Sequence, residues 1–427
     1  MLKRVALSDV ELGMFIHKME GSWFKHPFWK SRFMLEDPDN LEHLRSSDLE
    51  SVIIDTSKGK DVAAVSGGRP PDASPSLAKP VDLSAPVTRA AALRTRRSVD
   101  LDATGPATIA TELKAAGVVA DRAQRAVSKA FADVRLGKAV SIRKAEPLVE
   151  EIYASVQRNP HAFGGLMRCK LNNEFVYRHA LSVSALMVSL ARKMQLAPDA
   201  VREAGLAGLF LDIGTNLLPR EAAAPNGDFS DAPPGIWRQH VGLGEKSLRE
   251  SGNFPESVIL ACSQHHEYMN GSGFPNGLKG AEISLFARMA AICDTFDYLL
   301  VGDNNAPPLD PAQAVARLGE MAGAFDADLL RHFIESVGIY PVGSFVRLRS
   351  DRLAMIVDED PDEVDKPVVS PFYSLKTSGR IRPKTIALAR CYGEDEIVGI
   401  ADLAGLELPE PEQLRELIFL QTHKMKK

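Results

Sequence analysis

Residues 265–283 read HHEYMNGSGFPNGLKGAEI, and residues 287–300 read ARMAAICDTFDYLL. The first stretch places two adjacent histidines, His265 and His266, before a loop that glycine and proline punctuate. The second stretch is apolar enough for a buried helix and carries a carboxylate, Asp294. Two histidines, a tight loop and a helical aspartate in close succession therefore predict a site for chemistry at this point of the chain.

Three more side chains of the same kind lie upstream, namely His179, Asp212 and His240. Neighbouring members of the whole set are 25 to 33 residues apart, roughly one helix–turn–helix step each. Successive helices of a compact bundle can deliver such ligands to one centre. Imidazole nitrogen and carboxylate oxygen suit Fe, Mn, Zn or Co, and a carboxylate can bridge two ions. The residues alone are equally consistent with scattered structural histidines, and with an Asp212 that caps the turn at Gly214.

The sequence motifs around these residues resemble those of the HD-GYP family, whose signature reads HHE, then GxGYP, then an aspartate in the following helix. Residues 177–187 (YRHALSVSALM), 208–219 (GLFLDIGTNLLP) and 237–248 (WRQHVGLGEKSL) resemble the other motif segments of that family. The resemblance covers about residues 165–340 and implies a bacterial metal-dependent phosphodiesterase of cyclic di-GMP signalling. GMFI, WFKHPF and VIIDT near the N-terminus resemble the domain that commonly precedes HD-GYP domains.

The resemblance also implies roles for individual residues. It implies one or two divalent transition metal ions, Fe, Mn or similar, with Asp212 as the shared, catalytic ligand. The implied metal ligands are His179, Asp212, His240, His265, His266 and Asp294. The implied substrate-binding residues are those of the GYP-like turn, Gly271, Gly273, Phe274 and Pro275. The same glycines and proline are also what any tight loop requires.

Four positions depart from the family pattern. Leu211 stands where a histidine is expected before Asp212, and Thr215 stands where a lysine is expected to meet phosphate. Phe274 replaces the tyrosine of GYP, and Asp303 lies near the place of an arginine. Losing even one donor to a phosphoryl transition state can lower the rate on the order of 10²–10³-fold. We therefore expect reduced or lost catalysis and a role in binding a partner or a nucleotide. The alternative is an active cyclic di-GMP phosphodiesterase.

The expected fold class is mainly α: an HD-type helical bundle with a small α+β N-terminal domain and a short C-terminal β-rich appendage. A hairpin is predicted from the strand-like runs 344–348 and 353–357, and strand-like pieces at 385–391. The predicted domain boundaries are 1–65 for the α+β module, 66–100 for a linker rich in Pro, Ser and Ala, 101–160 for connecting helices, 161–340 for the metal domain and 341–427 for the C-terminal strands and a final helix.

Charge and composition narrow the function further. The 427 residues carry a formal net charge of −5, so we expect no nucleic acid polymer as a partner. No apolar run reaches the roughly 20 residues of a membrane helix, and four scattered cysteines give no disulfide framework. A cytoplasmic protein is expected. The expected partners are cyclic di-GMP or a related nucleotide, a signalling protein, and a second copy of the chain.

Overall fold

The computed structural model describes residues 2–21, 33–35, 38, 41, 45, 49–60, 107–169, 175–219, 221, 232–302, 306–321, 323–360, 363, 365–391 and 395–424. The chain divides into two compact units, Met1–Asp100 and Leu101–Lys427. The linker predicted over residues 66–100 and the departure at Asp303 lie outside the described residues. The exact domain boundaries stay a prediction.

The first unit is built on an antiparallel sheet. Its strand order is β1 (Leu2–Val5), β4 (Leu49–Asp55), β2 (Phe15–Gly21) and β3 (Phe33–Met34). A short 3₁₀ helix, Leu7–Asp9, follows the first strand. The fully or nearly buried side chains that hold this unit together are Val5, Val10, Met14, Ile16, Leu35, Val52 and Ile54. This core confirms a small N-terminal module with strands.

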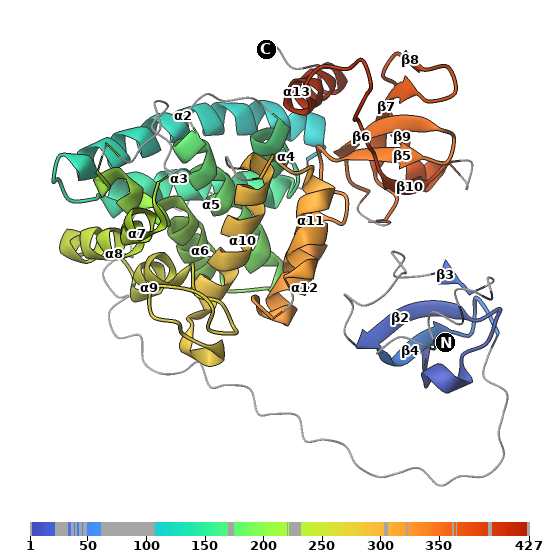
Figure 1. Cartoon of the computed structure of the whole chain (residues 1–427), viewed down its shortest axis with the longest axis horizontal. Helices are drawn as coiled ribbons and strands as arrows, with labels where there is room; N and C mark the ends of the chain where they lie inside the picture. Colours follow the sequence, from blue (N-terminus) through green and yellow to red (C-terminus); the bar gives the residue numbers. More distant parts are fainter. Residues whose placement is uncertain are drawn as a thin grey trace, which may run out of the picture. The chain divides into compact units, whose positions relative to one another are not determined.

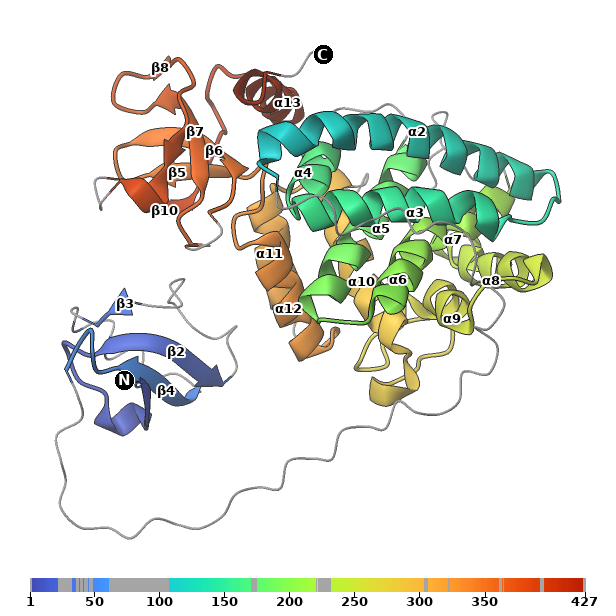
Figure 2. The same ribbon diagram turned by 180° about the vertical axis from the view of Figure 1, so that it is seen from behind.

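A long helical hairpin opens the second unit. It consists of α2 (Ile109–Arg135) and α3 (Ile142–Arg158), which lie side by side in Figure 2. Thr108 caps the start of α2, since its side chain accepts a hydrogen bond from the backbone N–H of Thr111. Buried residues recur at helical spacing along α2, which is the pattern of a helix that covers a core.

The bundle that follows is entirely helical, as expected. Its α-helices are α4 (Ala162–Cys169), α5 (Phe175–Lys193), α6 (Pro198–Phe210), α7 (Pro234–Trp237), α8 (Gln239–Ser251), α9 (Glu256–Gln264), α10 (Leu285–Val301), α11 (Pro311–Glu320) and α12 (Ala327–Val337). The 3₁₀ helices η4 (Ile213–Leu217) and η6 (Gly280–Glu282) interrupt them. Helix α5 runs through the middle and packs against α2, α3, α6, α10 and α12 (Figure 1).

The C-terminal part is a larger sheet than the predicted hairpin. β5 (Phe345–Leu348) and β6 (Arg352–Asp358) form that hairpin, and β7 (Val368–Ser374), β8 (Gly379–Arg380), β9 (Ile386–Ala387) and β10 (Ile397–Ile400) extend it. The strand order is β10-β5-β6-β7-β8, with β9 paired to β7, and all pairs are antiparallel. Helix α13 (Pro411–Thr422) packs on α4, β6 and β7 (Figure 1).

The strand expected over 385–391 is shorter than predicted. Pairing with β7 lasts only through β9, and the chain then turns into a 3₁₀ helix, Leu388–Arg390, because the Leu388 backbone N–H bonds the Pro367 carbonyl and the leucine side chain is buried. The expected mainly helical fold with a β-rich C-terminal appendage is nevertheless confirmed. Across the described residues we find no helix that combines the length and the hydropathy of a membrane span.

Candidate metal centre

Six side chains singled out from the sequence meet in one largely buried cluster. They come from α5, from the turn between α6 and η4, from α8, from the end of α9 and from α10. Their ligand atoms form two groups, and within each group all of these atoms lie within 4.8 Å of one another. The imidazole group consists of His240, His265 and His266. The carboxylate group consists of His179, Asp212 and Asp294.

A close approach of two backbones places Asp212 beside α8. A Cβ atom at Gly214 would lie 2.0 Å from the carbonyl oxygen of His240 and 2.5 Å from the backbone nitrogen of Gly244. No real side chain tolerates such distances, so only glycine allows η4 to approach α8 this closely. The turn that carries Asp212 is thereby brought against the first turn of α8, which carries His240.

Asp212 lies between the two groups. Its Oδ1 atom is 3.4 Å from Nε2 of His240 and 3.5 Å from Nε2 of His265. Its Oδ2 atom is 3.3 Å from Nε2 of His179. Burial by itself would raise the pKa of the Asp212 carboxyl, but the imidazoles of His179 and His265 outweigh it and hold that pKa well below its usual range. The carboxylate is therefore ionised and presents one oxygen to each group, which is the geometry of a bridging ligand.

Backbone carbonyls orient two members of the imidazole group. Nδ1 of His240 donates to the carbonyl of Trp237 at 2.6 Å, and Nδ1 of His265 donates to the carbonyl of Cys262 at 2.8 Å. Since a carbonyl can only accept, each neutral ring keeps its proton on Nδ1 and its lone pair on Nε2. The two Nε2 atoms are 3.3 Å apart and both face Asp212 Oδ1. Such convergent lone pairs suit a shared cation.

Buried polar atoms without hydrogen bonds test whether a metal fits. Within the described residues, Nε2 of His266 and Oδ1 of Asp212 are buried and have no hydrogen-bond partner. Leaving such an atom unsatisfied costs about 1–3 kcal/mol, and more when it is charged. A divalent cation with nitrogen and oxygen ligands would satisfy both atoms, so the donor set fits the Fe- or Mn-type ion that the sequence predicts.

Asp297 is a functional residue that the sequence analysis missed. Its Oδ2 atom is 2.8 Å from Nδ1 of His179, whose Nε2 atom lies 3.1 Å from Asp294 Oδ1. Ser182 donates a second hydrogen bond to the Asp297 carboxylate. Burial would raise the pKa of Asp297, but His179 holds it below its usual value, and Arg178 adds to this. Asp297 thus fixes the ring of His179 as a carboxylate behind a metal-binding histidine does. The sequence did contain a sign of this role, since Asp297 lies three residues after Asp294 on a mainly apolar helix and such a spacing places two side chains on the same face.

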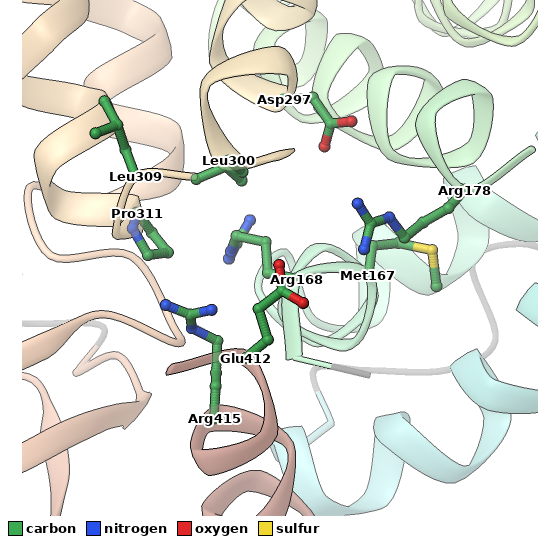
Figure 3. Close-up of a pocket in the computed structure, with 9 residues that line it drawn as sticks. All are labelled: Met167, Arg168, Arg178, Asp297, Leu300, Leu309, Pro311, Glu412 and Arg415. Carbon is green, nitrogen blue, oxygen red and sulfur yellow. The ribbon is translucent and has the colours of Figure 1, made fainter. Parts of the chain in front are cut away.

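A cavity of about 30 Å³ lies on the far side of Asp297 (Figure 3). Three arginines from three helices line it, Arg168 on α4, Arg178 on α5 and Arg415 on α13. The cavity holds a few water molecules at most, so it cannot take a nucleotide. Of the three arginines, Arg178 favours the ionised carboxylate of Asp297 that His179 needs, whereas Arg415 is paired with Asp310 at 3.4 Å.

The loop after the histidine pair contacts the centre through Phe274. The Phe274 ring stacks on His266, with ring centroids 4.5 Å apart and planes 25° apart. The Phe274 backbone N–H donates to the His266 carbonyl at 3.0 Å. A Cβ at Gly273 would lie 2.3 Å from that same carbonyl oxygen, so glycine is required for the loop to fold back here. Gly271, with φ of +79°, and Pro275, joined to Phe274 by a cis peptide bond, complete the turn.

Glu267, the glutamate of the HHE segment, holds this loop in place. It is 1% exposed, and its carboxylate accepts hydrogen bonds from the backbone N–H groups of Asn276 at 2.6 Å and Leu278 at 3.0 Å. Both donors lie beyond Pro275, so the glutamate ties the far end of the loop to the histidine pair. The sequence analysis noted this glutamate only as part of a motif and gave it no role.

The comparisons with known proteins agree with this geometry. A family model described as an HD domain matches residues 167–329, and one described as a domain of unknown function, DUF3391, matches residues 2–145. The cyclic di-GMP phosphodiesterase PA4108 of Pseudomonas aeruginosa is 37% identical over 402 residues, which are 93% of this chain and 92% of that protein. The chain belongs to the HD-GYP family.

Other HD-GYP relatives match a smaller part of the chain. The 3′3′-cGAMP-specific phosphodiesterase 1 of Vibrio cholerae is 31% identical over 128 residues, 30% of this chain and 29% of that protein. A solved structure of the HDG"Y"P protein Bd1817 of Bdellovibrio bacteriovorus superposes with a TM-score of 0.43 at 16% identity, covering 78% of this chain and 99% of that one.

Besides Phe274, two more departures from the HD-GYP pattern can be placed in the structure. Leu211 is buried, and its backbone carbonyl accepts a hydrogen bond from the thiol of Cys262 at 3.2 Å. Thr215 is also buried, and its hydroxyl donates to the backbone carbonyl of Asp212 at 2.8 Å. Thr215 therefore stabilises the turn that carries Asp212 and offers no cation to a phosphate. Neither departure prevents the assembly of the two ligand groups.

Proposed function

We propose that this protein is an active, metal-dependent phosphodiesterase that hydrolyses cyclic di-GMP. The observation that carries the proposal is the position of Asp212, which belongs to the carboxylate group through one oxygen and faces the imidazole group with the other. The high identity to a cyclic di-GMP phosphodiesterase along nearly the whole chain supports the choice of substrate. Together they favour the alternative from the sequence analysis over the loss of catalysis expected from Leu211 and Thr215.

In this proposal, each group holds one divalent ion. His179, Asp212 and Asp294 would hold the first, and His240, His265 and His266, with bridging Asp212, would hold the second. Such ions, when bound, acidify water and offset the negative charge of a phosphodiester under attack. The protein's own share is to fix the ligand geometry, and Asp297 and the carbonyls of Trp237 and Cys262 do this for the histidines.

Phe274 and its loop close one side of the centre. Because the ring stacks on His266, it restricts how that imidazole can turn and shields it from bulk water. An aromatic ring of this kind can also support a nucleobase or a sugar face. The loop residues Gly271, Gly273, Phe274 and Pro275 are accordingly proposed as part of the substrate site.

Turnover by the full chain, purified without chelator and supplied with Mn²⁺ or Fe²⁺, tests the proposal. Cyclic di-GMP is compared with 3′3′-cGAMP, and Asp212→Asn is compared with Asp199→Asn, an exposed aspartate at the other end of α6. We expect hydrolysis of cyclic di-GMP that falls at least 10³-fold in Asp212→Asn and is unchanged in Asp199→Asn.

Two results would contradict the proposal. A folded, metal-loaded protein without turnover would leave a binding protein, and the search would pass to the signalling protein partner expected from the sequence. Faster hydrolysis of 3′3′-cGAMP than of cyclic di-GMP would keep the phosphodiesterase and change its substrate.

A further inference from the structure

Two consecutive residues, Trp237 and Arg238, lie next to residues of the metal centre. They join α7 to α8 and stand just before His240. The Trp237 ring lies against the His240 ring, with centroids 4.4 Å apart and an angle of 39°. The guanidinium of Arg238 lies over the Phe274 ring, 4.9 Å from its centroid. Both side chains therefore contact residues that the proposed function uses.

Arg238 and His266 both lie against the ring of Phe274. The guanidinium carbon of Arg238 is 4.9 Å from the centroid of that ring, and the centroid of the His266 ring is 4.5 Å from it. One aromatic side chain thus brings the positive charge of Arg238 near a proposed metal ligand. A cation over an aromatic face is positioned by the ring and keeps its N–H donors free at the edges.

The charge of Arg238 is not used elsewhere in the described part of the chain. Its side chain is exposed, and among the described residues it makes no ion pair or side-chain hydrogen bond. Arg249, about three turns further along α8, is the opposite case. It pairs with Glu245 and with Glu256, each at 2.9 Å. Of these two arginines, only Arg238 has donors available for an anion.

A further cation near the centre would offset the charge of a bound dinucleotide. The side chains around the centre include the carboxylates of Asp212, Asp294 and Asp297, and the lysine that the family pattern places at 215 is a buried threonine. A cyclic dinucleotide carries two phosphodiesters. While one is held among the metal ligands, the other must lie further out, and its charge has to be met there.

We propose that Arg238 is a substrate-binding residue that holds the phosphodiester of the cyclic dinucleotide that is not being cleaved. This inference rests on the proposed function. The guanidinium offers several N–H donors in a plane, which suits bidentate contact with phosphate oxygens. Because that phosphate does not react, the contact has the same strength in the ground state and the transition state, and it lowers KM without raising kcat.

A substrate with a single phosphodiester separates this role from a structural one. The full chain, loaded with Mn²⁺, is assayed on cyclic di-GMP and on bis(p-nitrophenyl) phosphate, which has no second phosphodiester. For Arg238→Ala we expect KM for cyclic di-GMP to rise about tenfold with kcat unchanged, the scale of one charged hydrogen bond. Both constants for bis(p-nitrophenyl) phosphate should stay as in the wild type. Arg238→Lys keeps the charge without the planar guanidinium, so its KM for cyclic di-GMP should lie between those of the wild type and Arg238→Ala.

The control and the contrary outcomes keep the two proposals distinct. Arg249→Ala, on the same helix, should change neither KM. An unchanged KM for cyclic di-GMP in Arg238→Ala overturns the role of Arg238, and so does an equal loss on both substrates, which would show a damaged centre. If the wild type hydrolyses neither substrate, the proposed function fails. Calorimetric affinities for cyclic di-GMP then decide the role of Arg238: a tenfold loss in Arg238→Ala supports it, and equal or undetectable binding overturns it.

Discussion

The imidazole group and the carboxylate group hold their histidines in different ways. Nδ1 of His240 and of His265 each bonds a carbonyl three residues earlier in the chain. Nδ1 of His179 instead bonds Asp297, which is 118 residues away in the sequence. The first arrangement forms as soon as a helical turn forms, whereas the second exists only when α5 and α10 pack together.

The two groups differ in charge as well. Three carboxylates surround His179, and although burial lowers its pKa, Asp212, Asp294 and Asp297 raise that pKa well above the usual value. Burial lowers the pKa of His240 and of His266, and it acts in the same direction on His265, but Asp212 outweighs it there and raises the His265 pKa. One half of the centre thus contains the carboxylates and depends on tertiary packing, and the other consists of imidazoles and depends on local backbone. Substitutions that affect only one half should show which of them limits activity.

The largest effect in this comparison is expected from Asp297→Asn. The amide cannot supply the charge that orients His179, so the carboxylate group should hold its ion about 10–100-fold more weakly. The imidazole group should keep its ion, since its backbone carbonyls are untouched. Metal titration with elemental analysis measures how tightly each group binds its ion. Turnover should fall in parallel with the occupancy of the carboxylate group. Asp328→Asn, an exposed aspartate on α12, is the control. Equal loss of both ions would show that the halves are not independent.

His161 and Glu359 form a second pair of a histidine and a buried carboxyl, and it can be compared with the pair of His179 and Asp297. Their Nδ1 and Oε1 atoms are 3.2 Å apart. Burial raises the pKa of Glu359 from 4.5 to about 8 and lowers that of His161 from 6.5 to about 4. The pair is therefore neutral at pH 7, whereas Asp297 is ionised. Both carboxyls are buried, and the hydrogen bond and charge of His179, with the charge of Arg178, account for the lower pKa of Asp297.

Stability should fall between pH 6.5 and pH 8 because of Glu359. In that window the folded protein keeps a proton on Glu359 that the unfolded chain has lost, so unfolding is favoured as the pH rises. Only below pH 6.5 does His161 act in the opposite direction. Glu359 should contribute a decrease of up to about 2 kcal/mol to the free energy of unfolding over the window. Glu359→Gln should make the measured decrease shallower by about that amount, while the decrease due to the raised pKa of His179 remains; urea denaturation at several pH values measures both. An identical slope in the variant would show that Glu359 is ionised throughout.

The smallest effect is expected from Leu211→His, which adds an imidazole where the family pattern has one. The carboxylate group should then bind its ion roughly fivefold more tightly, about 1 kcal/mol, because loss of buried leucine packing offsets part of the gain. Mn²⁺ titration measures the change. Leu211→Gln, polar but a poor ligand, should give no gain. Weaker binding in Leu211→His would show that the side chain at 211 cannot reach the centre.

The sequence by itself determined which residues meet in the cluster and the class of fold. The six residues predicted as metal ligands could be named because helical spacing and family motifs are local patterns, and the structure brings all six together. The helical bundle and the first C-terminal hairpin follow from periodicity in the same way. The role of Glu267 and the full extent of the C-terminal sheet were not found, since both depend on hydrogen bonds between separate segments.

Only the tertiary structure decided how the ligands are supported and what the departures mean. Asp297 gains its role because α10 packs against α5, and Thr215 takes a structural one because its hydroxyl donates to the Asp212 carbonyl. Arg238 acquires a place over Phe274 because two distant segments meet beside His266. A sequence pattern specifies only which residue types follow one another along the chain. Charge and hydrogen bonding depend on distances between atoms, which exist only once the chain has folded.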